Sequence, residues 1–127
     1  MTTEPPSPLP SSGRAAAVSV DVVVPVYNEE QILESSIGRL SDYLAATFPF
    51  EWRVIIADNA STDATSAIAA RLAAADSRVR HLRLEQKGRG RALRAAWMGS
   101  DADIVVYTDV DLSSGLTGLL PLVAALI

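Results

Sequence analysis

Short apolar runs alternate along the chain with longer segments of helical periodicity. Runs rich in β-branched residues predict strands, and apolar positions three and four residues apart predict helices. The expected strands are residues 18–26, 52–57, 79–84 and 104–108. A helix opened by residues 27–30 should end near 47, and others should cover 64–75, 91–98 and a segment from about 116. This alternation predicts an α/β fold with a mainly parallel sheet and helices on both faces.

The two ends of the 127-residue chain differ from its middle. Residues 1–17 hold four prolines and no apolar segment, which predicts a disordered leader before a single domain at 18–127. The last stretch, Leu116 to Ile127, is apolar and uncapped, so we expect a domain that is incomplete at its C-terminus. No apolar run is long enough to span a membrane. The absence of a secretory signal predicts a cytoplasmic protein.

Composition excludes some classes of function. There is no cysteine, so neither a disulfide nor a thiolate metal site can form. The formal net charge of −4 argues against a nucleic-acid partner. Seven of the 11 lysines and arginines nevertheless lie between Arg78 and Arg94. They form either a solvated face or a local positive field beside an anionic ligand.

The strongest candidate for chemistry follows the fourth expected strand. There Asp109 and Asp111 are spaced i and i+2, and in an extended segment such side chains point to the same side. Two carboxylates at the end of a buried strand can hold a divalent cation and a phosphate-bearing ligand. Open α/β sheets also place their ligands at the carboxyl ends of strands.

The loop after the first strand carries Pro25, Tyr27, Asn28, Glu29 and Glu30. Pro25 restricts the backbone as the strand ends, Tyr27 offers a ring for stacking on a base, and Glu29 offers a carboxylate. The alternative is a capped helix start, with Asn28 as the cap and the two glutamates complementing the helix dipole.

Two more polar loops follow the second and third strands. Asp58 stands where a carboxylate can accept the N–H of a nucleobase ring, while residues 61–63 are suited to capping the next helix. In the third loop, Gly88 and Gly90 alternate with cations, and glycines let a backbone approach a diphosphate. This G-x-G is not a dinucleotide fingerprint, because the third glycine is missing. His81, the single histidine, is interpreted as a strand residue.

Taken together, the segments VVVPVYNEE, VIIADNASTDAT, KGRGRALRAAW and VVYTDVDLSS resemble the inverting nucleotide-sugar glycosyltransferases of family 2, which have the GT-A fold. The resemblance is closest to the dolichol- and polyprenyl-phosphate sugar transferases. It implies a hexosyltransferase that takes a sugar from a nucleoside-diphosphate sugar to an acceptor, either a polyprenyl phosphate or a cell-envelope glycan. It also implies Mg²⁺ or Mn²⁺ as cofactor and work at the cytoplasmic face of a membrane.

The resemblance assigns roles residue by residue. Asp109 and Asp111 match the family's D-x-D, which binds the divalent metal, and Asp109 also contacts the donor diphosphate and sugar. The remaining matches surround the donor nucleotide: Pro25, Tyr27, Glu29, Asp58 as base reader and Arg89 near the diphosphate.

Some positions depart from the family pattern. Asn59 and Ala60 replace a common Asp-Gly, and Ser114-Gly115 replaces the usual residues after the D-x-D. No general base can be assigned, although a lipid phosphate needs one less because it is already anionic. Two alternatives stay open: a fragment that binds nucleotide without turnover, and a phosphatase-like enzyme with Asp109 as nucleophile. The second is disfavoured because its D-x-D normally follows the first strand.

Overall fold

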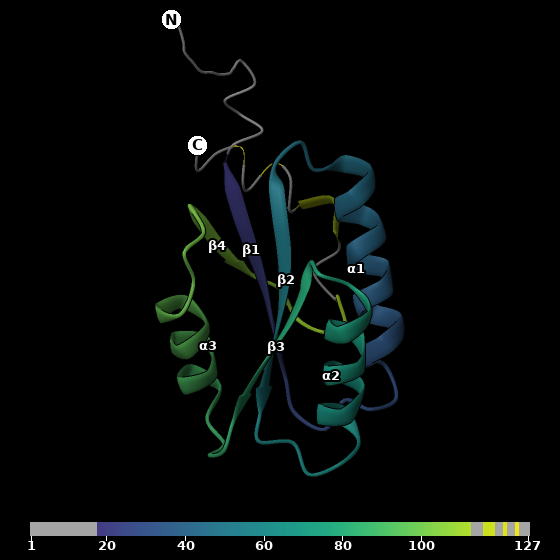
Figure 1. Ribbon diagram of the computed structural model, residues 1–127, viewed down its shortest axis with the longest axis vertical. Helices are drawn as coiled ribbons and strands as arrows, with labels where there is room; N and C mark the ends of the chain where they lie inside the picture. Colours follow the sequence, from purple (N-terminus) through teal and green to yellow (C-terminus); the bar gives the residue numbers. More distant parts are fainter. Residues whose placement is uncertain (1–17, 113–115, 119–120, 122–123, 125–127) are drawn as a thin grey trace, which may run out of the picture.

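The computed structural model describes residues 18–112, 116–118, 121 and 124 (Figure 1). Its four strands form one parallel sheet in the order β3-β2-β1-β4. The strands are β1 (Ser19–Val26), β2 (Glu51–Asn59), β3 (Val79–Leu84) and β4 (Ile104–Tyr107). The helices are α1 (Leu33–Thr47), α2 (Thr65–Ala75) and α3 (Arg89–Met98), and a 3-10 turn covers Leu116–Gly118.

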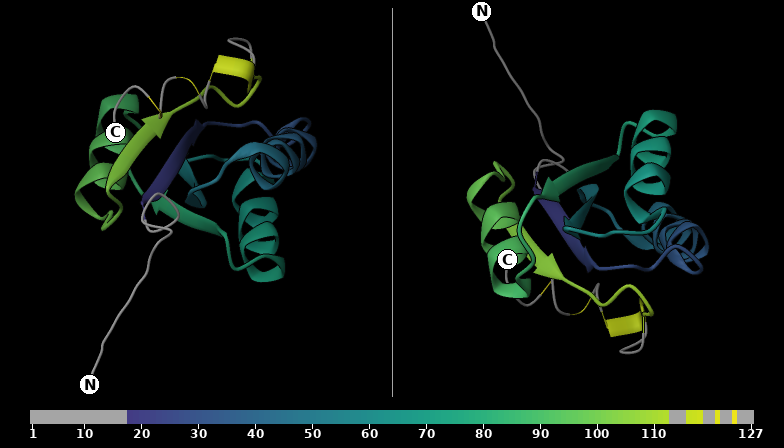
Figure 2. Two further views of the ribbon diagram at one scale, coloured as in Figure 1. Left: turned by 90° about the horizontal axis from the view of Figure 1, so that it is seen from above. Right: turned by 90° about the horizontal axis from the view of Figure 1, so that it is seen from below.

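The helices cover both faces of the sheet. Helices α1 and α2 lie on one face and α3 lies on the other (Figures 1 and 2). From β1 the chain steps outward through β2 to β3, and α3 then carries it back to β4 on the far side of β1. The predicted parallel α/β architecture, with helices on both faces, is therefore confirmed.

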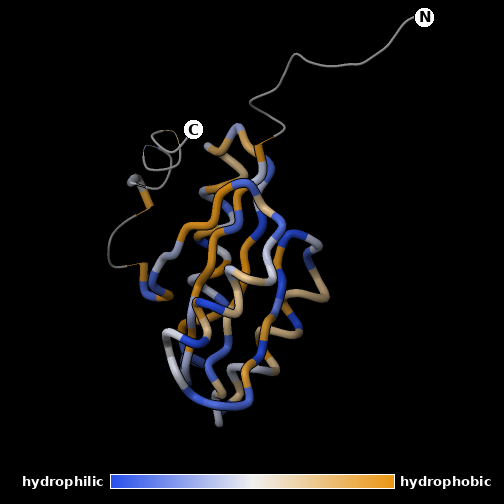
Figure 3. The backbone as a smooth tube through the Cα atoms, turned by 90° about the vertical axis from the view of Figure 1, so that its left-hand side faces the viewer, coloured by the Kyte–Doolittle hydropathy of each residue, from blue (hydrophilic) through white to orange (hydrophobic). Residues whose placement is uncertain are grey.

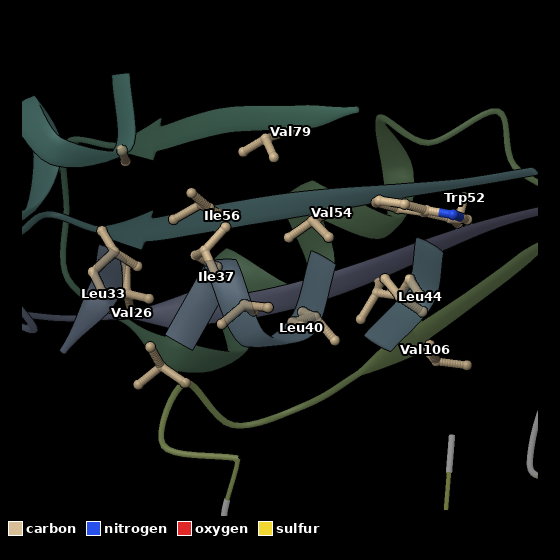
Figure 4. Packing of buried hydrophobic residues seen from close by; sticks show 14 of the residues in the cluster. Val26, Leu33, Ile37, Leu40, Leu44, Trp52, Val54, Ile56, Val79 and Val106 are labelled. Atoms are coloured by element: carbon tan, nitrogen blue, oxygen red, sulfur yellow. The ribbon is translucent and has the colours of Figure 1, made fainter. Parts of the chain in front are cut away.

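The larger core lies between the sheet and helices α1 and α2. Apolar side chains of α1 at helical spacing point toward alternate residues of β1 and β2 (Figure 4). The smaller core joins Val23, Ile55 and Ala57 to Ala92 and Ala96 of α3. The strands are therefore largely hydrophobic and the loops at their lower end largely hydrophilic (Figure 3).

A polar cluster ties the connection before β4 to the middle of the sheet. Asp21 in β1 is only 2% exposed and accepts hydrogen bonds from Arg53 Nε at 2.9 Å and Ser100 Oγ at 2.6 Å. Arg53 also pairs with Asp101 at 2.8 Å. Because a buried carboxylate is costly unless it is paired, this network fixes how the chain enters β4.

Several predicted boundaries shift. β2 extends to Asn59, β4 ends at Tyr107, and α1 begins only at Leu33. Gly90, expected in a loop, lies in the first turn of α3. The residues that follow Gly90 in α3 favour a helix, so the helix tolerates one glycine near its start.

Parts of the chain at both ends lie outside the described residues. They include the predicted leader at 1–17, Ser114 and Gly115, and most of the helix expected from Leu116. Within the part that the structure describes, no helix is both long and apolar enough to cross a membrane.

The core predicts a sharp contrast along α1. Replacing the fully buried Leu40 with alanine should lower the free energy of unfolding by about 2–5 kcal/mol, because it leaves a cavity against the sheet. Replacing its exposed neighbour Arg39 with alanine should change it by less than about 0.5 kcal/mol. Urea unfolding followed by circular dichroism measures both. Equal costs for the two variants would contradict this packing.

Candidate functional site

The carboxyl ends of β1 and β4 are neighbours at a point where the chain diverges. Pairing of the two strands ends at Val23 and Tyr107, and the Val23 carbonyl accepts a hydrogen bond from the Thr108 N–H at 3.0 Å. The chain leaves β1 toward α1 on one face, whereas it reaches β4 from α3 on the other. Such a switch point is where open α/β sheets bind ligands. The polar loops after β1 and β4 therefore flank the position where sheets of this topology bind ligands.

The loop after β1 is bonded along its length to the loop after β2. The Asn28 N–H donates to Ser61 Oγ at 2.9 Å, and Asn28 Oδ1 accepts from the Thr62 N–H at 2.8 Å. The Glu29 N–H donates to Thr65 Oγ1 at 2.8 Å. These bonds give the two loops one defined shape without any ligand.

Asn28 does not cap its own helix. Its Oδ1 accepts from the N–H groups of Thr62 and Asp63, and Glu30 Oε1 accepts from the Ala64 N–H at 2.9 Å, just before α2. Helix α1 begins instead beyond Ile32, which makes no side-chain cap. The expectation that Asn28 caps the following helix is wrong. Asn28 has φ of 52°, a left-handed conformation that asparagine tolerates and that lets it reach the second loop.

Asp109 and Asp111 lie in a tight turn directly after β4. Val110 and Leu112 are buried on either side of Asp111, so they anchor the turn in the protein. The Leu112 N–H donates to the Asp109 carbonyl at 2.9 Å, and Leu112 has φ of 56°. The extended geometry assumed from the sequence is therefore wrong here, although the carboxylates still face outward relative to their buried neighbours.

Glu29 and Asp111 are close enough to influence each other. Burial raises the pKa of Glu29 above its usual range, and the negative charges of Asp111 and then Asp63 raise it further. These three carboxylates come from three different loops. The structure thus brings the predicted Glu29 and Asp111 together in one negatively charged region.

The carboxylates of the D-x-D fit a hard divalent cation. Oxygen ligands suit Mg²⁺ and Mn²⁺, and Mg²⁺ commonly takes one or two carboxylates together with substrate phosphates and water. Among the described residues, no group of three or more histidine, cysteine or acidic side chains is arranged to hold a metal by itself. Asp109 and Asp111 would accordingly share the ion with a phosphate-bearing ligand.

Asp58 is fully buried at the end of β2. Its carboxylate accepts hydrogen bonds from the Ser61 N–H at 3.1 Å, from Ser66 Oγ, and from Arg83 Nη1 at 3.2 Å. Burial acts most strongly and raises the pKa of Asp58, but the bonds from Ser61 and Ser66 and the Arg83 charge outweigh it and lower the pKa. The role of Asp58 as base reader stays a prediction. In this structure its carboxylate shapes the second loop.

Asn59, noted in the sequence only as a departure from the family pattern, has a role in the loops around the site. Its Oδ1 accepts a hydrogen bond from the Gly88 N–H at 2.6 Å, which joins the second loop to the third. Successive strand residues point to opposite faces, so Asn59 faces away from Asp58. The only signal in the sequence was a second polar residue at the end of an apolar run.

Lys87 connects the third loop to the first. Its Nζ lies 4.0 Å from the centroid of the Tyr27 ring, a cation–π contact. Arg89 begins α3, but its side chain lies outside the described residues. Pro25 lies in β1 opposite Ala57, beyond the last pair with β4.

The cations between Arg78 and Arg94 do not form a single patch. Arg78 lies 4.6 Å from the centroid of the Trp52 ring, near the amino end of the sheet, and Arg83 pairs with Asp58 and Glu85. Arg78 and Arg83 therefore do not contribute to a positive field at the third loop. His81 lies in β3 as expected, with Nε2 3.6 Å from Asp58 Oδ2.

With polar loops at the carboxyl edge of a four-stranded parallel sheet, the architecture is that of a Rossmann-like α/β domain. The sequence model of glycosyl transferase family 2 matches residues 21–126. The chain belongs to this family, as the resemblance implied.

Similar proteins include a glycosyltransferase, a glucosyltransferase and a protein of succinoglycan biosynthesis. Glycosyltransferase AglD of Haloferax volcanii is 38% identical over 116 residues, which cover 90% of this chain and 19% of the relative. The dolichyl-phosphate beta-glucosyltransferase of Drosophila melanogaster is 31% identical over 109 residues, 80% of this chain and 33% of the relative. The succinoglycan biosynthesis protein ExoA of Rhizobium meliloti is 38% identical over 95 residues, which cover 72% of this chain and 28% of the relative. The chain thus spans about a fifth to a third of these proteins.

The buried carboxylate predicts a dependence of stability on pH. Folding lowers the pKa of Asp58, so its contribution is complete above the unfolded value of about 3.9 and is lost as the pH falls through the folded value. Asp58→Asn should cost about 1–3 kcal/mol at pH 7 and flatten the fall in stability below pH 4. Urea unfolding between pH 7 and 2.5 measures this. The exposed Asp42→Asn is the control, and a D58N curve parallel to the wild type would refute the assignment.

Proposed function

We propose that this chain forms the donor-binding part of an inverting glycosyltransferase that uses a nucleoside-diphosphate sugar. The observation that carries the proposal is that the loop with Tyr27 and Glu29 and the loop with Asp111 follow adjacent strands at the switch point between β1 and β4. An aromatic ring on one side and a D-x-D on the other match the two ends of such a ligand. The family membership supports the same chemistry.

Different residues of the site contact different parts of the donor. The Tyr27 ring stacks on the base, with Pro25 and Asp58 shaping the loops around it, and Glu29 lies between the base and the D-x-D. Asp109 and Asp111 would hold Mg²⁺ or Mn²⁺, and Arg89 adds positive charge from the third loop. When bound, the metal stabilises the negative charge of the leaving nucleoside diphosphate.

The acceptor attacks the anomeric carbon from the side opposite the leaving group, which inverts the configuration at that carbon. The proposed acceptor is a polyprenyl phosphate, since one similar protein is a dolichyl-phosphate glucosyltransferase and another a dodecaprenyl-phosphate galacturonate synthase. A hexose is the proposed sugar on the same ground. A phosphate oxygen is already anionic, so none of the residues above is assigned as a general base.

Binding tests the donor site without requiring turnover. UDP and GDP should bind the wild-type chain more tightly with Mn²⁺ than without it, and Asp111→Ala should remove at least about tenfold of that gain. Isothermal titration calorimetry gives both affinities. The matched control is Asp42→Ala, which removes an exposed carboxylate from α1. Equal metal-dependent binding by D111A and the control would rule out the metal role.

A further inference from the structure

The Lys87 ammonium covers a face of the Tyr27 ring. The Lys87 ammonium lies 4.0 Å from the ring centroid, in the position where a stacked base would make contact. Tyr27 itself is half-buried. A nucleotide that stacks on this face must therefore displace the ammonium group.

Lys87 is tethered by its backbone but free along its side chain. The next residue, Gly88, donates its N–H to Asn59 Oδ1 at 2.6 Å and accepts from the Ala92 N–H at 2.9 Å. These bonds hold the third loop against β2 and α3. The side chain of Lys87 is exposed and has four rotatable bonds, so the ammonium can swing while the loop stays in place.

The diphosphate of the proposed donor passes within reach of this group. A base on Tyr27 and a metal at Asp109 and Asp111 place the two phosphates between the first and fourth loops. The first and fourth loops follow adjacent strands, whose pairing reaches Val23 and Tyr107, so this interval is short. An ammonium that leaves the ring can then pair with the diphosphate.

We propose that Lys87 exchanges partners when the donor binds, leaving the Tyr27 ring for the diphosphate. This inference rests on the proposed donor site and adds a way for that site to distinguish nucleoside diphosphates from nucleosides. A nucleoside without phosphates must displace the ammonium and receives no new contact from it. A nucleoside diphosphate gains an ion pair in return. Lys87 thus selects diphosphates over the corresponding nucleosides.

Methionine is neutral and similar in length to lysine, so Lys87→Met separates the effect of Lys87 on nucleosides from its effect on nucleoside diphosphates. Lys87→Met should bind uridine and guanosine unchanged or about two- to fivefold more tightly, the range expected for losing an exposed cation–π contact. The same variant should bind UDP and GDP with Mg²⁺ at least about fivefold more weakly. Lys87→Arg should restore the wild-type order, because it keeps the charge. Arg94→Met removes an exposed cation from α3 and should alter neither affinity.

A second measurement observes the exchange directly. In the ligand-free protein the side-chain protons of Lys87 should show an upfield ring-current shift by NMR, which saturating UDP or GDP with Mg²⁺ should abolish. Absence of the shift, or its persistence with ligand, would overturn the exchange. So would K87M affinities that move in the same direction for nucleoside and diphosphate. If D111A also leaves metal-dependent binding intact, the donor site itself fails rather than Lys87 alone.

Discussion

The position of β1 between β2 and β4 is the constraint on which the rest of the molecule depends. Its valines are buried on both faces, so β1 can only lie in the middle of a sheet covered by helices on each side. Once it is central, the chain must add β2 and β3 on one side and return through α3 to add β4 on the other. That return creates the switch point between β1 and β4, where sheets of this topology bind ligands.

The loops at this switch point are fixed by hydrogen bonds to one another rather than by capping of the helices that follow them. Asn28 and Glu30 supply acceptors to the start of α2, and Asn59 supplies one to Gly88. Each contact satisfies backbone N–H groups that a helix start or a turn would otherwise leave open. The first three loops consequently form one connected surface. A ligand that binds there meets groups already oriented, which reduces the ordering cost of binding.

Charge is distributed unevenly across this surface. Carboxylates of Glu29, Asp63 and Asp111 share one region, whereas Asp58 is neutralised internally by Arg83. The first group retains a negative field that a divalent cation would offset, and the second stabilises the fold. Residues of the same type, all at the carboxyl ends of strands, thus serve different purposes because their burial and partners differ.

The strands could be predicted from local composition, and the family from four short motifs, because both are properties of neighbouring residues. β-branched runs define the strands, and β3 was predicted to the residue. The roles of Asn28 and Asn59 could not, since their partners lie 29 to 35 positions away in sequence, and nothing nearby marks them. The start of α3 was also misjudged, because a glycine in a first helical turn has the same local signature as a glycine in a loop.

By itself, then, the sequence determined the alternation of strands and helices, the apolar faces and the acidic pair after the fourth strand, because these follow from the periodicity of neighbouring residues. Only the tertiary structure decided which carboxylate is buried, which helix Asn28 caps and which ring Lys87 covers. These outcomes depend on the order of strands in the sheet, which brings loops from distant parts of the chain to one edge.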